Sequence, residues 1–323
     1  MLTQKDSRIK LSIYALFIVF VVASVFIGVG KITLSEIFLT SSSSNLIFFE
    51  SRLPRTVSLI ITGFGLSISG LIFQRISNNK FVSSTTSGSV SGAHLGLAVS
   101  MVYLSGASTT IKMLFGMAVS LLASFLFLMI VNRLKYRSLI FVPLIGMMLS
   151  SILTSIATFL GYTFNFLQTL ESWFVGSLSL VIAGRFELLY IILPAVIVTF
   201  IYANQFTIIG LGEDYSVNIG LNYNFFVTVG LILTSVISAS TVIIIGYLPF
   251  LGLVVPNIMS IVFGDNLKGN VLTVGVFGSL FLLICDILSR VVIYPYEISA
   301  SLVMGIIGTL IFLVMIFGER QSA

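Results

Sequence analysis

Charged residues are scarce in this sequence. Of its 323 residues only 8% are Asp, Glu, Lys or Arg, whereas 57% are hydrophobic, and a soluble domain normally carries about 25% charged residues. A chain with so few charges cannot cover a globular surface with groups that water solvates well. The composition therefore predicts an integral membrane protein.

Cysteine and histidine are nearly absent. The single cysteine, Cys285, lies in an apolar run, which excludes an internal disulfide and a metal site built from several cysteines. The single histidine, His94, has no carboxylate near it in the sequence, so we interpret it as an interior residue rather than a proton carrier or metal ligand. We expect no metal site on this chain.

Motifs for catalysis and nucleotide binding are also missing. VGKIT at 29–33 lacks the upstream glycine and the hydroxyl residue directly after Lys31 that a phosphate-binding loop requires. Neither His-Glu-x-x-His nor Gly-x-Ser-x-Gly occurs, so a membrane protease or lipase has no catalytic group to use. The Lys and Arg residues are scattered singly, which argues against nucleic acid as a partner. The sequence predicts neither an enzyme nor a chain that binds a cofactor.

Apolar runs of membrane-spanning length recur along the whole chain. Roughly 18 apolar residues or more suffice to cross the bilayer as a helix, whereas membrane strands would appear as alternating segments of about 10 residues. The predicted fold class is an all-α integral membrane protein, a bundle of about ten transmembrane helices in a single domain over 1–323. The predicted spans are 11–30, 56–75, 88–105, 111–131, 139–161, 187–204, 225–246, 250–263, 271–293 and 298–317.

The distribution of Lys and Arg over the short loops predicts the orientation of the bundle, because cytoplasmic loops carry an excess of these residues. An even number of spans also requires both termini on one side. We therefore expect the N-terminus, 1–10, and the C-terminus, 319–323, to be cytoplasmic. With that orientation the cytoplasmic side carries Lys5, Arg8, Lys10, Arg75, Lys80, Arg133, Lys135, Arg137, Lys268 and Arg320.

A polar segment at 211–224 runs against this charge rule, because it places Glu213 and Asp214 on the cytoplasmic side. Gly212 and Gly220 bracket about two helical turns, in whose first turn the two carboxylates suit the helix dipole. An ordinary amphipathic loop helix would explain that placement within the turn. It would not explain acidic residues on the side that usually carries Lys and Arg.

Two further patterns concern helix packing. Gly88, Gly92 and Gly96 recur at every fourth residue, which predicts a helix face that lets a neighbouring helix approach closely. Asp286 and Arg290 are also four residues apart, so they share a helix face and can form an ion pair. We favour a structural role for this pair over a proton relay, because no further ionisable groups mark a path through the membrane.

Several segments together resemble one family of transport proteins. They are RLPR at 52–55, GFGLSISGLIFQ at 63–74, SGSVSGAHLG at 87–96, LGEDYSVNIGLN at 211–222, GYLPFLGLVVPNI at 246–258 and DILSR at 286–290. In this order they resemble the permease subunits of binding-protein-dependent ABC importers for iron-siderophores, haem and cobalamin, the FecCD type. The family has ten spans with both ends cytoplasmic.

The resemblance implies a set of partners in a bacterial cytoplasmic membrane, whether inner or sole. They are a second permease subunit in a homodimer or a paired heterodimer, two cytoplasmic ATPase subunits that bind ATP-Mg, and an extracytoplasmic siderophore-binding protein. ATP hydrolysis would then take place on the partner subunits, and this chain would hold no cofactor itself.

The resemblance also implies roles for particular residues. In the family, the loop between the sixth and seventh spans forms short coupling helices that enter a cleft of the ATPase. In this sequence that loop is 211–224, with Gly212, Glu213, Asp214, Tyr215, Asn218 and Gly220 as the candidate coupling residues. On the outer side, Arg52, Arg55 and Arg290 match arginines that dock the binding protein through its glutamates. Arginine suits this contact because its charge is permanent and it binds carboxylates in a bidentate manner.

Departures from the family pattern bear on the substrate. The stretch RISNNKFVSSTTSGSVSGA at 75–93 lacks the prolines that family members commonly have there, and Glu297 is not followed by Pro-Val-Gly. These departures indicate a divergent siderophore branch, for which we expect ferric siderophores of the catecholate type. The serine-containing fifth span is our candidate for lining the pore. The alternative function is a secondary transporter or channel, which would continue uptake after deletion of the ATPase.

Overall fold

The computed structural model describes residues 4–28, 43–83, 88–133, 141–176, 178, 181, 183–184, 186–264 and 267–319. Within these ranges every regular element is a helix. Lys135, Arg137 and the segment 320–323, which the sequence predicts to be cytoplasmic, lie outside the described residues, as does Lys31.

Six helices in the described ranges are long and apolar enough to cross a membrane. They are α1 (Gln4–Phe26), α4 (Leu53–Ile76), α6 (Thr109–Asn132), α7 (Phe141–Thr163), α12 (Tyr223–Ile244) and α14 (Leu267–Val291). Three further apolar helices are shorter or have a shorter apolar part, namely α5 (Ser89–Tyr103), α13 (Leu251–Phe263) and α15 (Ala300–Glu319).

The predicted sixth span is a bent pair of helices rather than one rod. A 3₁₀ turn, η4 (Phe186–Ile191), leads into α9 (Ile192–Ile201), and α10 (Ala203–Ile209) then turns away by 68°. The predicted span 187–204 therefore continues past the break at Tyr202, because apolar composition alone cannot register a change of direction. Counted as one span, the pair is the seventh segment long enough to cross.

Short elements fill the connections. They are α3 (Ser43–Ile47), the π-helical turn η1 (Phe48–Arg52), α8 (Leu167–Phe174) and α11 (Glu213–Asn218). The element η1 continues directly into α4, so the apolar stretch extends from Asn45 to Ile76.

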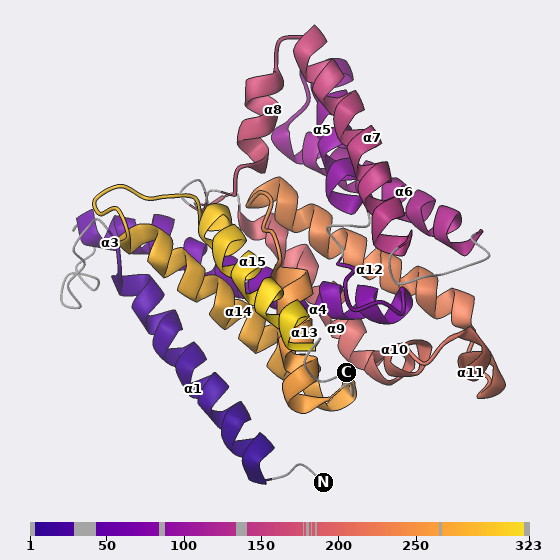
Figure 1. The fold of residues 1–323 in the computed structure, drawn as a ribbon. Coiled ribbons are helices and arrows are strands. Elements are labelled where there is room, and N and C mark those ends of the chain that lie inside the picture. Colours follow the sequence, from indigo (N-terminus) through magenta and orange to yellow (C-terminus); the bar gives the residue numbers. More distant parts are fainter. Residues whose placement is uncertain are drawn as a thin grey trace.

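Helix α4 is the central element of the bundle. It packs against α14, α12 and α13, and most of its residues are buried. Gly70 makes the contact with α13 possible, because a Cβ atom at this position would lie 1.8 Å from the carbonyl oxygen of Gly252. Figure 1 shows α5, α6, α7 and α8 gathered on one side of the molecule, with α1, α14 and α15 on another.

Gly88, Gly92 and Gly96, which the sequence predicts to form one helix-packing face, do not all lie on one face. Gly92 and Gly96 face α6, where added Cβ atoms would lie 2.5 Å from the Cβ of Ala123 and 2.7 Å from the Cα of Gly116. Gly88 precedes α5 as its N-cap with φ of 81°, and a Cβ there would approach Leu149 of α7 instead. The close contact between α5 and α6 therefore involves two of the three glycines, because α5 begins only after Gly88.

Candidate functional site

The segment 211–224 forms a short helix between two turns. Gly212 precedes α11 with φ of 108° and ψ of 165°, a backbone conformation that residues with a Cβ rarely adopt. After α11, the side chain of Asn222 accepts a hydrogen bond from the backbone N–H of Phe225 and so caps α12. In Figure 1 the helix α11 lies at the periphery of the molecule, next to α10 and the start of α12.

One buried side chain holds α11 against α10. The hydroxyl of Ser216 donates to the carbonyl oxygens of Gly212 at 2.7 Å and Ile208 at 3.3 Å, and the side chain is inaccessible to solvent. The backbone N–H of Leu221 donates in turn to the carbonyl oxygen of Ser216. Sequence reasoning missed Ser216, although it is the one polar residue of the helix that faces inward.

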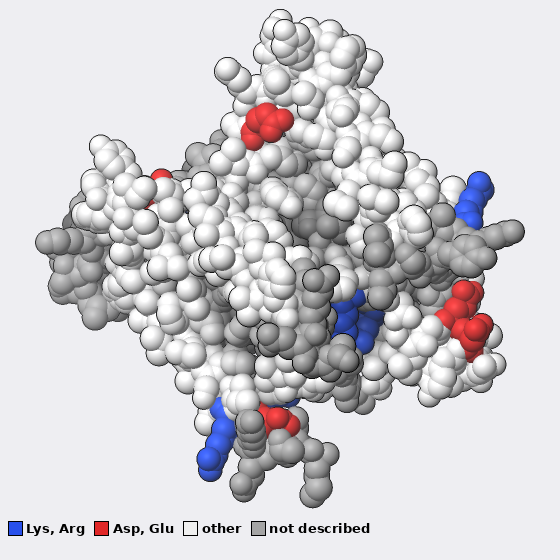
Figure 2. Space-filling model, in the orientation of Figure 1, with Lys and Arg blue, Asp and Glu red and all other residues white. Residues whose placement is uncertain are grey.

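The opposite side of the helix is exposed. We name this surface the α11 patch; it consists of Leu211, Glu213, Asp214, Tyr215, Val217 and Ile219. Its four apolar side chains are each half or more exposed. Figure 2 shows acidic atoms at the edge of the molecule where Figure 1 places α11. Asn218 and Gly220 are exposed beside the patch, whereas Gly212 is half-buried, so five of the six predicted coupling residues are exposed around α11.

At the opposite end of the bundle, charged residues meet in the interior. We name the set Arg52, Arg55, Asp286, Arg290 and Glu297 the arginine cluster. Arg55 donates from Nη2 to Asp286 Oδ1 at 2.7 Å and from Nη1 to Glu297 Oε2 at 2.8 Å. Arg290 pairs through Nη2 with Asp286 Oδ2. One carboxylate thus lies between two guanidinium groups.

The arginine cluster ties three helices together. Arg290 Nη1 donates to the carbonyl oxygens of Ser24 and Ile27, both at 2.8 Å, at the end of α1. Arg52 also donates to the Ile27 carbonyl oxygen. The Ser24 carbonyl belongs to the last turn of α1 and Ile27 directly follows that helix, a position where cations are favourably placed.

The three arginines that the sequence predicts to dock a binding protein are buried in the structure. Arg52 and Arg55 are each 7% exposed and Arg290 is 2% exposed. The prediction had them project outward to a partner protein. In this structure their guanidinium groups form hydrogen bonds and ion pairs with other residues of this chain, because α1 and α14 pack against α4.

The fold also brings together residues that the sequence gave no reason to connect. Glu297 is 242 residues from Arg55, and Glu171 of α8 lies with its Oε1 atom 3.6 Å from Nε2 of His94. His94 also meets the ring of Phe174 edge to face. Neither acid has a spacing to its partner that a sequence pattern could reveal. In the described ranges, no group of three or more His, Cys, Asp or Glu residues could hold a metal ion.

Comparison with known proteins assigns the family. The model of the FecCD transport family matches residues 16–318, which is nearly the whole chain, so this protein belongs to that family and is a permease. It is 46% identical to the petrobactin import system permease protein YclN of Bacillus subtilis (strain 168), over 96% of this chain and 98% of the relative. It is 36% identical to the ferric-anguibactin transport system permease protein FatD of Vibrio anguillarum, over 93% of this chain and 95% of that protein.

A solved structure shares the fold. It shows an inward-facing conformation of a transporter assigned to the metal-chelate type of ABC transporters, and it superposes with a TM-score of 0.81. The alignment covers 96% of this chain and 99% of the other at 22% sequence identity.

Proposed function

We propose that this chain is the membrane-spanning subunit of an ATP-driven importer of ferric siderophores. The observation that carries the proposal is the α11 patch, an exposed surface of four apolar and two acidic side chains that follows α10, the second half of the bent sixth span. Exposed apolar groups rimmed by charge are typical of protein contact sites. A cytoplasmic ATPase subunit that binds ATP-Mg is the partner that fits this surface in a transport-family permease.

The relatives support the choice of cargo. Both are named for ferric siderophore systems, petrobactin import and ferric-anguibactin transport, and they cover almost the full length of this chain. A catecholate chelate is the finer part of the proposal. ATPase measurements on the assembled transporter with a panel of ferric catecholate, hydroxamate and carboxylate chelates would test it.

The topology we propose has ten spans in one domain over 1–323, with both termini in the cytoplasm of a bacterium. Ten helical segments support it, because the six long helices, the bent pair and the three shorter apolar helices each overlap one predicted run. The segments 1–10 and 319–323 would then lie on the same side as the α11 patch.

A second permease subunit completes the proposed pore, as an identical copy or a related chain. Helix α7 supports a second subunit, because few of its residues are buried within the chain and most of its surface is free to contact another chain. Its Ser151 and Ser155 are exposed at mid-helix, and hydroxyl groups inside a span are enriched at contacts between helices. We therefore propose α7 as the pore lining.

The end that bears the arginine cluster is the proposed docking surface for an extracytoplasmic siderophore-binding protein. Glu297 supports a specific form of this contact, because its side chain is 24% exposed and is the most accessible bonding partner of Arg55. A carboxylate of the binding protein could replace Glu297 on Arg55 without disturbing Asp286. Docking would then be an exchange of carboxylates.

Reversing both charges of the α11 patch tests the central proposal. The double variant Glu213→Lys, Asp214→Lys should lower the ATPase activity that is stimulated by the loaded binding protein at least about tenfold, since like charges would face each other at the contact. The assay uses the complete transporter in proteoliposomes, and ATP hydrolysis and siderophore uptake are measured together.

Glu187→Lys is the matched control, because Glu187 is also exposed but lies at the other end of the sixth span. It should retain coupled activity. Wild-type coupling in the double variant would refute the role of the patch. Uptake that persists without any ATPase subunit would refute the importer itself and favour a secondary transporter.

A further inference from the structure

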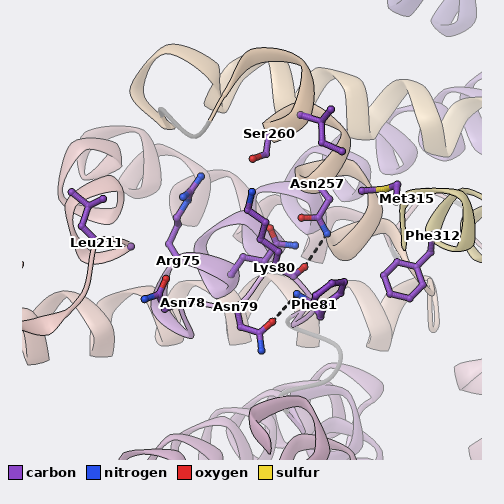
Figure 3. A pocket seen from close by; sticks show the side chains of 13 residues that line it. Arg75, Asn78, Asn79, Lys80, Phe81, Leu211, Asn257, Ser260, Phe312 and Met315 are labelled. Carbon is purple, nitrogen blue, oxygen red and sulfur yellow. Dashed lines mark hydrogen bonds between the residues drawn. The ribbon is translucent and has the colours of Figure 1, made fainter. Parts of the chain in front are cut away.

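A pocket of about 420 Å³ lies where four parts of the chain meet. These parts are the end of α4 with the loop 77–83 that follows it, the α10–α11 connection, the end of α13 and the last turns of α15. The volume falls within the range of about 300–1,000 Å³ that is common for ligand sites. Figure 3 shows Arg75, Lys80, Asn257 and Ser260 around one shared space.

The lining of the pocket is basic and rich in amides. Arg75 and Lys80 carry its positive charge, and no acidic side chain is found among the described residues that line it. Three neighbouring amides, Gln74, Asn78 and Asn79, complete the wall on this side. Arg75 and Lys80 also interact within the chain, and a lining with two basic residues favours an anionic ligand.

A buried oxygen adds a second requirement. Asn257 is 5% exposed, and its Nδ2 donates to the carbonyl oxygen of Lys80 at 2.9 Å. Its Oδ1 has no hydrogen-bond partner among the described residues. A buried acceptor without a partner costs about 1–3 kcal/mol. The pocket thus favours a ligand that carries hydroxyl donors as well as negative charge.

The position of the pocket along the spanning helices indicates the level of the membrane at which such a ligand would bind. Arg75 is in the last turn of α4, and Ile261 and Met315 are near the ends of α13 and α15. All three helices are apolar segments of the membrane domain, so the pocket lies at the level of the lipid headgroups. Leu211 and Ile261, both at least 60% exposed, offer apolar surface at its rim.

We propose that this pocket binds the headgroup of an anionic glycerophospholipid that carries free hydroxyls, of the phosphatidylglycerol type. The phosphate lies against Arg75 and Lys80, since basic pockets between spans hold anionic headgroups. A glycerol hydroxyl donates to Asn257 Oδ1. Because Leu211 belongs to both the pocket and the α11 patch, the lipid contacts the connection that leads into α11.

Lipid binding to the purified full-length chain tests the proposal by native mass spectrometry. Three lipids with identical acyl chains are compared: phosphatidylglycerol, phosphatidylmethanol, which has the charge but no hydroxyl, and phosphatidylcholine. The wild type should prefer them in that order. Lys80→Gln and Arg75→Gln should each weaken phosphatidylglycerol binding about fivefold, the effect of one basic residue near an anionic lipid surface.

Asn257→Leu separates the two parts of the headgroup contact. It should bind phosphatidylglycerol and phosphatidylmethanol equally while still preferring both to phosphatidylcholine. Arg133→Gln is the matched control, because Arg133 is an exposed basic residue at the end of another span and does not line the pocket. It should bind like the wild type.

Three results would overturn the proposal. They are equal binding of the three lipids by the wild type, equal losses in Lys80→Gln and Arg133→Gln, and release of phosphatidylglycerol by excess inorganic phosphate, which would identify a site for the free anion. Lys80 is exposed in a loop, so Lys80→Gln should fold as the wild type does. The inference requires only that the chain spans a membrane. A negative result in the lipid-binding test would therefore leave the proposal of siderophore import unaffected, and the reverse also holds.

Discussion

Arg55 and Asp286 join the start of α4 to the last turns of α14, with Nη2 of the arginine 2.7 Å from Oδ1 of the aspartate. The two residues are 231 positions apart in the sequence, and Asp286 is completely buried. The same carboxylate pairs with Arg290 through its second oxygen. Asp286 is therefore the residue on which the charge balance of the arginine cluster depends.

Asp286→Asn should destabilise the protein severely. The substitution leaves two buried guanidinium groups without their shared carboxylate, and breaking a buried pair by removing one partner typically costs about 3–5 kcal/mol. We expect a large drop in the Tm of the full-length chain in detergent, measured by circular dichroism.

Glu297→Gln is the control for Asp286→Asn, since it removes a carboxylate from the same cluster but at a position that is 24% exposed. Its effect on Tm should be the smaller of the two, because water can replace the lost contact. Equal Tm values for Asp286→Asn and the wild type would show that the cluster is not needed for stability.

Gly70→Ala should disrupt the crossing of α4 and α13. The added Cβ atom would lie 1.8 Å from the carbonyl oxygen of Gly252, so the helices would have to separate. We expect a loss of at least about 3 kcal/mol in the free energy of unfolding, the upper part of the usual range for overpacking. In Gly106→Ala the new methyl group meets nothing within 4 Å, and thermal unfolding should be unchanged. Equal stability of the two variants would contradict the close crossing.

Gly212→Ala should impair coupling with little effect on the bundle. There is room for a methyl group at this position, but φ of 108° imposes strain of about 1–3 kcal/mol on a residue with a Cβ. The start of α11 would shift to relieve the strain, and transport-coupled ATPase activity should fall. Gly269→Ala, which also has open space but no such φ, should retain activity. Similar activities in both variants would mean that the turn geometry is not needed for coupling.

Removal of the apolar groups of the α11 patch should separate binding from stability. Tyr215 and Val217 are 50% and 56% exposed, so the double alanine variant should change the free energy of unfolding by less than about 1 kcal/mol. Its affinity for the ATPase subunit should fall at least about tenfold, as expected for two anchoring side chains. Co-purification with the ATPase subunit at graded concentrations measures this loss. Tyr103→Ala, which is 77% exposed at the end of α5, should leave the affinity intact, and an equal loss there would contradict a specific contact.

Composition and apolar runs were sufficient to predict the helical segments. A run of apolar residues has one stable backbone arrangement in a bilayer, the helix, because no water is present to satisfy its peptide groups. The same reasoning could not reveal the 68° bend near Tyr202 or the N-cap conformation of Gly88. Both are features of the backbone angles, which apolar composition does not specify.

The sequence by itself determined that this protein is a helical membrane protein, and it singled out the acidic segment before α12. Helical periodicity was also enough to place Asp286 and Arg290 on one face of α14, since residues four apart are neighbours on any helix. Only the tertiary structure decided that Arg55 and Glu297 join them and that the arginines are buried. The physical reason is distance along the chain. Contacts between residues hundreds of positions apart depend on how the helices pack, and the close approach of Gly70 to Gly252 shows that packing is set by backbone contact that no local pattern encodes.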